Sequence, residues 1–190
     1  MQAHPSIELY VNLNDEQQNK QVEQALSTIN LDSVVINTLQ LAGITLPVML
    51  TLLITDDAGI QDMNKQYREQ DKATDVLSFP LLEQPIVQAP EDQLWTPQIE
   101  EGTEAEQSNP AFVTPPGMLT NLGDIVISWP TILLQAQAAG HDYQTELIYL
   151  FSHGVLHLIG YDDQTEAGYQ AMVGIQQAVL QTMGQKAYRA

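Results

Sequence analysis

The sequence contains no cysteine among its 190 residues, which excludes disulfides and thiolate metal ligands. It also lacks a charged-then-apolar leader and any uninterrupted apolar run of about eighteen residues, the length that a membrane helix requires. These absences predict a cytoplasmic protein with no membrane partner. Any bound ion must be held by histidine, aspartate or glutamate side chains.

Basic residues are also scarce. Six lysines and arginines stand against 24 aspartates and glutamates, so the net charge is −18. Because nucleic-acid-binding proteins usually carry a basic surface, this composition alone argues against RNA or DNA as a partner. However, half of the cations lie within eight residues, at Lys65, Arg68 and Lys72. This cluster could contact phosphates, or it could be a solvated helix end that pairs with Glu69 and Asp71.

Hydrophobic periodicity predicts one α+β domain over residues 1–190. The apolar run at 48–54 suits a strand buried on both faces, so it should be central in the sheet. We expect a four-stranded mixed sheet packed with five to six helices. The expected strands are 7–13, 48–54, 75–79 and 122–128, and the expected helices are 16–29, 31–43, 57–68, 130–139, 143–158 and 164–183.

Residues 82–121 differ in composition from the rest of the chain. They hold six of the ten prolines and seven acidic residues, but no lysine or arginine. This composition predicts a long, extended and mobile acidic insertion between the third and fourth strands. Alternatively, the insertion could bind a basic partner or cover a site, and Trp95 could anchor it on the domain.

One stretch of the sequence, 153–163 (HGVLHLIGYDD), has the pattern of a metal site. His153 and His157 are four residues apart, so they share one face of a helix. Gly160 can adopt the positive φ that ends the helix, and Asp163 can then supply a third ligand. Three protein ligands with a vacant fourth position describe a catalytic zinc-type centre on a helix and the turn after it. The alternative is a pair of surface or internally hydrogen-bonded histidines.

Three blocks of the sequence resemble the signature blocks of the YbeY family, which comprises bacterial single-domain metal-dependent endoribonucleases of ribosomal RNA maturation. The blocks are 64–80 (NKQYREQDKATDVLSFP), 122–127 (LGDIVI) and 153–163, in the family's order. The resemblance implies a four-stranded sheet covered by helices. It also implies single-strand-specific cleavage of ribosomal RNA in 16S 3′ end processing and ribosome quality control, with ribosomal proteins or a ribosome-associated GTPase as partners.

The resemblance assigns the metal ligands. His153 and His157 match the family's first two ligands and are expected to be essential for catalysis. The third ligand is usually a histidine, and here that position is Asp163. A carboxylate lowers the net charge of the site, so we expect slower hydrolysis with the metal retained. Zinc is the expected ion because two imidazoles suit it best, although manganese or magnesium could be tolerated.

The resemblance also assigns a catalytic arginine. Arg68 matches an arginine that faces the metal and is needed for activity, and it would neutralise charge developing on the phosphoryl group. We expect Lys65 and Lys72 to bind substrate beside it. The sequence does not single out a general base: Asp75 and Asp162 are candidates, but capping or turn formation is the favoured role for each.

Two other functions stay open. A zinc peptidase shares the histidine spacing, but it needs a glutamate directly after the first histidine, where this chain has Gly154. A non-catalytic ribosome-assembly factor would suit both the net charge and Asp163. Such a protein could dock on basic ribosomal proteins and meet RNA only through its few local cations.

Overall fold

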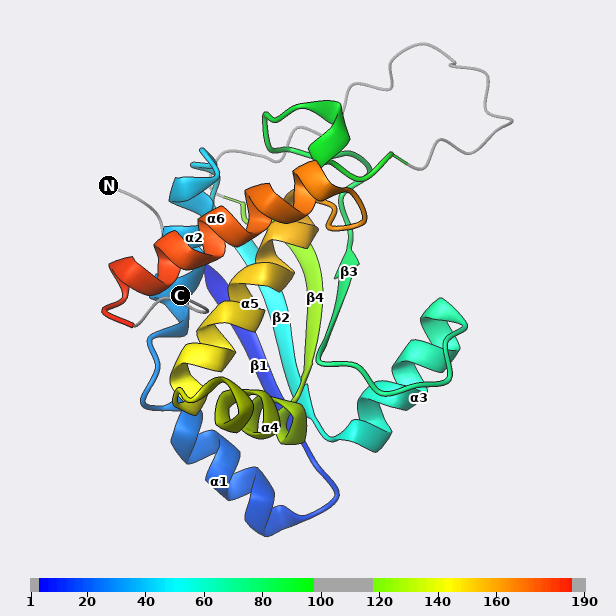
Figure 1. Cartoon of the computed structure of the whole chain (residues 1–190), viewed down its shortest axis with the longest axis vertical. Coiled ribbons are helices and arrows are strands. Elements are labelled where there is room, and N and C mark those ends of the chain that lie inside the picture. The colour runs from blue at the N-terminus through cyan, green and yellow to red at the C-terminus, as the bar shows by residue number, and fades with distance from the viewer. Residues whose placement is uncertain (1–3, 98–117, 186–190) are drawn as a thin grey trace.

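The computed structural model describes residues 4–97 and 118–185, which form one sheet and a set of helices (Figure 1). The predicted α+β class is confirmed, and each predicted element is present with ends that differ by a few residues. None of the described helices combines the length and apolar character needed to cross a bilayer. The strands are β1 (Ser6–Asn12), β2 (Val48–Thr55), β3 (Val76–Pro80) and β4 (Thr120–Ser128). The helices are α1 (Glu16–Leu26), α2 (Leu31–Leu41), α3 (Asp57–Arg68), α4 (Trp129–Ala139), α5 (Tyr143–Ile159) and α6 (Glu166–Thr182), with a 3₁₀ turn η1 (Glu91–Gln93).

The sheet is mixed, as predicted, with strand order β1-β2-β4-β3. β1 pairs with β2 and β2 with β4 in parallel, whereas β3 pairs with β4 in antiparallel orientation. β2 therefore lies inside the sheet, as predicted, but one of its faces is buried and the other is mostly half-buried, so burial on both faces is only partly confirmed. β3 is an edge strand of the described sheet, so one side of its backbone is available to side chains from elsewhere.

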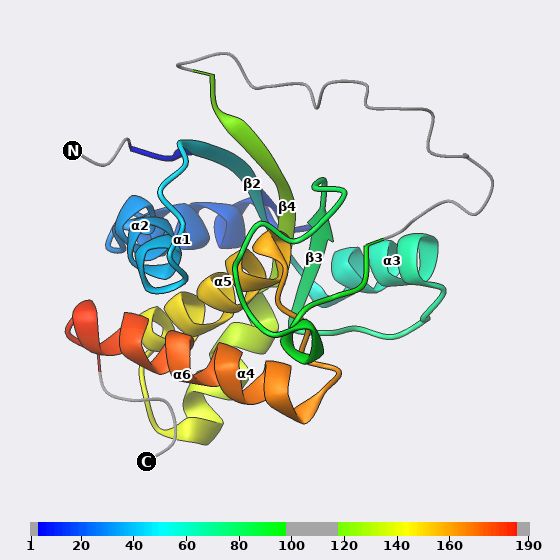
Figure 2. The same ribbon diagram turned by 90° about the horizontal axis from the view of Figure 1, so that it is seen from above.

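Helices cover the two faces of the sheet unequally (Figures 1 and 2). α5 crosses one face with α1, α2, α4 and α6 around it, whereas α3 packs against β3 and β4 from the other face. Because successive strand residues point to opposite faces, Val126 meets Ile60 of α3, and Ile125 and Ile127 join the main core. β3 contacts both α3 and α5. β3 therefore lies between α3 and α5, the helix that carries the two predicted histidine ligands.

The insertion begins differently from the prediction. Residues 82–97, which we call the strap, pack on the C-terminal end of α5 instead of extending away from the domain. The Trp95 indole Nε1 donates to the His157 carbonyl at 2.8 Å, and the Ile86 N–H donates to the Ile159 carbonyl at 3.0 Å. Because the last carbonyls of a helix have no partner within it, they provide this docking edge. Residues 82–97 therefore do not form the extended arm that we expected, and Trp95 anchors them on the domain as predicted. Residues 98–117, which make up most of the rest of the predicted insertion, lie outside the described residues.

Gly154 lies where α5 crosses β4. A Cβ at this position would lie 2.8 Å from Ile125 Cγ2 and 3.0 Å from its Cδ1. Ile125 is fully buried and β-branched, so its side chain cannot turn away at little cost. The absence of a side chain at Gly154 allows α5 to lie directly on the sheet. Any side chain at this position would point into Ile125 of β4.

Replacing Gly154 with alanine should destabilise the protein. Overpacking typically costs about 1–3 kcal/mol, which exceeds the gain of roughly 1 kcal/mol in helix propensity. Gly174→Ala in α6 is the matched control, because nothing lies within 4 Å of a Cβ there and only the propensity gain applies. Denaturant unfolding of the metal-free variants measures both changes. If Gly154→Ala were as stabilising as Gly174→Ala, the close contact would not constrain α5.

Candidate metal centre

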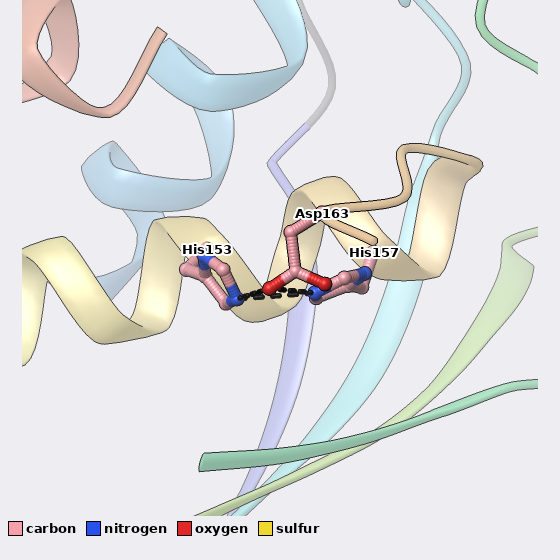
Figure 3. A group of neighbouring side chains, drawn as sticks. All are labelled: His153, His157 and Asp163. Carbon is pink, nitrogen blue, oxygen red and sulfur yellow. Dashed lines mark hydrogen bonds and ion pairs between the residues drawn. The ribbon is translucent and has the colours of Figure 1, made fainter. Parts of the chain in front are cut away.

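The three predicted ligands converge on one point (Figure 3). His153 and His157 project from the same face of α5, and their Nε2 atoms are 3.0 Å apart. The Asp163 Oδ2 atom lies 3.5 Å from His153 Nε2 and 3.6 Å from His157 Nε2. The side chains are one-third exposed or less, at 19%, 21% and 33% for His153, His157 and Asp163 respectively. The group is therefore partly sheltered but reachable.

Hydrogen bonds on the far side of each imidazole fix which nitrogen faces the group. His157 Nδ1 lies 2.9 Å from the Tyr161 carbonyl, which can only accept, so Nδ1 carries the proton. His153 Nδ1 lies 3.4 Å from Gln176 Oε1. The Gln176 amide nitrogen donates to the Tyr149 carbonyl at 3.0 Å, which leaves the amide oxygen facing His153. With a proton on each Nδ1, the two Nε2 atoms are left to face one another and the Asp163 carboxylate.

This donor set fits a divalent ion. In a tetrahedral zinc site with bonds of 2.0–2.1 Å to nitrogen, neighbouring ligand atoms are about 3.3 Å apart. The three separations of 3.0, 3.5 and 3.6 Å bracket that value. Two imidazoles and a carboxylate match His₂-carboxylate hydrolytic sites, which keep a fourth position for water or substrate. The residues present can therefore hold a metal ion in an open site.

Asp163 is an anion at neutral pH. Hydrogen bonding to the His153 and His157 imidazoles holds the pKa of its carboxyl well below the usual range, against a smaller opposing effect of burial. Such bonds require a proton on an imidazole Nε2, which is the position that an ion would otherwise take. A proton and a metal ion therefore compete for the same place between the three side chains.

The loop that returns Asp163 to α5 is held from two sides. Gly160 ends the helix with φ +136°, a conformation that side-chain-bearing residues rarely adopt, as the sequence predicted. The strap then pairs with the loop: the Trp95 N–H donates to the Gly160 carbonyl, and the Asp162 N–H donates to the Gln93 carbonyl, each at 2.9 Å. The strap thus positions the third ligand as well as the end of the helix.

A hollow of about 800 Å³ opens beside the three ligands. Its walls come from the metal group, from β3 and the loop before it, from the strap, and from two of the three predicted substrate-binding cations, Arg68 and Lys72. Lys65 does not line the hollow, and its Nζ pairs with an Asp71 carboxylate oxygen at 3.7 Å on an exposed surface. The structure thus separates Lys65 from the other two cations.

Arg68 is held in place although it is exposed. Its Nη2 atom donates to the Ser78 carbonyl on the open edge of β3 at 2.5 Å, and its guanidinium lies 5.6 Å from the Phe79 ring centroid. α3 ends after Arg68 because Glu69 takes a left-handed conformation. These contacts orient the guanidinium before a substrate arrives.

Three further polar groups line the hollow. Asp75 accepts from the Val76 N–H at 2.8 Å, and Asp162 accepts from the Gln164 N–H at 3.0 Å, which are the turn and capping roles that the sequence favoured. The Ser78 hydroxyl is the buried side-chain polar atom that has no hydrogen-bond partner in the described part of the chain. It is therefore an unused donor and acceptor in the wall of the hollow.

Gln176 is the site residue that the sequence interpretation missed. It lies on the buried stripe of α6 with Met172 and Val179, and it is only 1% exposed. A polar side chain at the spacing of buried apolar residues was the available signal, because a buried amide needs hydrogen-bond partners. Nothing in the local sequence indicates that one of its partners is His153.

Comparison with known proteins gives a consistent result. The family model described as "Endoribonuclease YbeY" matches residues 12–184. A protein of that name from Roseiflexus sp. is 38% identical over 148 residues, which cover 77% of this chain and 78% of the relative. Another from Desulforamulus reducens is 37% identical over 172 residues, which cover 90% of this chain and 95% of the relative. A solution structure from Thermotoga maritima covers 94% of this chain and 91% of its own at 18% identity, but its TM-score of 0.46 is too low to support a structural argument.

Replacing Gln176 with leucine should weaken zinc binding about 10- to 100-fold, because the His153 ring loses the partner that orients it. Gln170→Leu on the exposed side of α6 is the control, since the Gln170 amide donates to Glu166 and does not reach the metal group. Competition with a chromogenic chelator gives the dissociation constants, and metal-free unfolding shows whether each variant folds. Equal zinc affinity in a folded Gln176→Leu protein would remove Gln176 from the metal centre.

Proposed function

The chain belongs to the endoribonuclease YbeY family, and on that premise we propose that it is a metal-dependent hydrolase that cuts single-stranded segments of ribosomal RNA. The proposed reaction serves 16S 3′ end processing and ribosome quality control. The observation that carries this proposal is the placement of His153, His157 and Asp163 on one wall of a hollow that also contains Arg68.

The side chains around the hollow suit phosphodiester hydrolysis. His153, His157 and Asp163 would hold the ion, for which zinc is the best match to two imidazoles and a carboxylate. An ion bound there would act as a Lewis acid and would lower the pKa of a water molecule bound to it. Arg68 presents a planar donor that can contact the phosphoryl oxygens as negative charge develops on them. The Ser78 carbonyl and the Phe79 ring hold that donor in position.

The scarcity of cations favours a single strand as the substrate. Duplexes are bound largely through many phosphate contacts, and the chain has six lysines and arginines in all. Arg68 and Lys72 can contact one or two phosphates of a strand that lies in the hollow. Affinity must then come from the bases or from a larger assembly, and ribosomal proteins or a ribosome-associated GTPase are the partners that we propose, in the cytoplasm.

The position of Gly154 argues against the peptidase alternative. A zinc peptidase needs a carboxylate next to the metal to take a proton from water and give one to the leaving amine. The Cβ direction at 154 points into Ile125 of the sheet, so no acidic side chain could act from this position. The nearby carboxylates Asp75 and Asp162 each accept a local backbone hydrogen bond, as expected of turn and capping residues.

Arg68→Ala should lower kcat on single-stranded ribosomal RNA by about 100-fold or more, because one preorganised donor to the transition state is lost. Its zinc content should be unchanged, since Arg68 is not among the metal ligands. Arg68→Lys should recover only part of the rate, because lysine lacks the planar fork. Lys20→Ala removes an exposed cation of α1 that does not line the hollow, so it is the matched control.

Full activity of zinc-loaded Arg68→Ala would contradict the role given to arginine. Zinc-dependent digestion of casein, abolished by His157→Ala, would favour the peptidase instead. A zinc-loaded wild-type protein that restores ribosomal RNA ends in a deficient strain, but cuts no RNA itself, would support the assembly factor.

A further inference from the structure

A second hollow, of about 520 Å³, adjoins the metal group on its other side. α4, α5 and α6 form most of its wall, which includes Gln135, Tyr149 and Tyr169. His153 and Asp163 line this hollow as well as the first one, so the ligands stand on the boundary between the two. A phosphate placed at the metal group would therefore have one hollow on each side.

The two hollows differ in chemistry. The first contains Arg68 and Lys72, whereas the second contains no lysine or arginine among the described residues that line it. Its charged lining consists of the carboxylates of Asp75 and Asp163, which also line the first hollow, so the difference between the two hollows is that Arg68 and Lys72 offset these charges only in the first. A phosphate would be repelled by the two carboxylates in the absence of a cation. The second hollow thus favours an uncharged group.

The lining of the second hollow suits the uncharged part of a nucleotide. Tyr169 is 43% exposed, so its ring can be covered by a planar ligand. The half-buried Gln135 carries an amide whose nitrogen donates to Asp75 Oδ2 at 3.4 Å, and whose oxygen can accept from the edge of a base. Unpaired bases in single-stranded RNA are commonly stacked on aromatic rings and hydrogen-bonded on their edges. The volume lies within the range of small-ligand sites.

We propose that the second hollow binds the nucleobase of a nucleotide next to the scissile phosphate, with Tyr169 stacking on the base and Gln135 contacting its edge. This inference rests on the proposed RNA substrate and adds a base-binding subsite to it. The strand passes over the metal group, with phosphates toward Arg68 in the first hollow and one base in the second. Base contacts thereby compensate for the few phosphate contacts that a protein of net charge −18 can make.

The test measures binding separately from cleavage. A short single-stranded RNA that carries a slowly hydrolysed phosphorothioate at the scissile phosphate is titrated with zinc-loaded protein by fluorescence anisotropy, and the unmodified RNA is used for kinetics. Tyr169→Ala should weaken binding and raise KM about tenfold with kcat within about twofold, as expected for the loss of one stacked base. Tyr169→Phe keeps the ring and should bind like the wild type. Tyr10→Ala removes a more exposed tyrosine, 55% exposed on β1 and outside both hollows, and should have no effect.

An abasic site on either side of the scissile phosphate identifies the group that is bound. One of the two abasic RNAs should bind the wild-type protein about tenfold more weakly than the intact RNA does. The Tyr169→Ala protein should bind this abasic RNA and the intact RNA with the same reduced affinity. Wild-type affinity in Tyr169→Ala, or equal loss on the abasic RNA in both proteins, overturns the subsite. Cleavage with unchanged binding in Tyr169→Ala refutes this inference alone, whereas tight, Tyr169-dependent binding without cleavage refutes the proposed function and supports the subsite.

Discussion

The structure depends on the convergence of three hydrogen-bond acceptors. The Nδ1 protons of His153 and His157 are bonded to oxygens on their far sides, so both Nε2 lone pairs face the Asp163 carboxylate within 3.6 Å. Such a group is electrostatically unfavourable unless a proton or a cation lies between its members. The surrounding residues nevertheless hold the three atoms at separations that fit a metal ion.

Each part of the fold near this group contributes to holding it. Gly154 allows α5 to lie on β4, and Gly160 turns the chain back toward the helix. The strap hydrogen-bonds to the turn and to the end of α5, while Gln176 reaches the group from α6. β3 brings Arg68 to the same hollow through its free edge. A small number of rigid elements thus positions ligands and arginine from distant parts of the sequence.

The residues that make local patterns could be identified from the sequence. Apolar periodicity located the strands and helices, and the spacing of His153, His157 and Asp163 located the metal group, because helix geometry determines which positions share a face. The contact between Gln176 and His153 could not be predicted, since it depends on how α6 packs against α5. Apart from its anchor Trp95, the packing of the strap was also missed, because its composition indicates an extended chain and its hydrogen bonds go to carbonyls at the end of another helix.

Metal content tests the central claim most directly. The wild-type protein, purified without chelators or nickel resin and then equilibrated with zinc, should contain about one ion per chain by mass spectrometry, and Asp163→Ala should contain much less. Circular dichroism verifies that the variant is folded. Less than about half an ion per wild-type chain, or equal content in Asp163→Ala, would contradict the account of a metal centre that the aspartate completes.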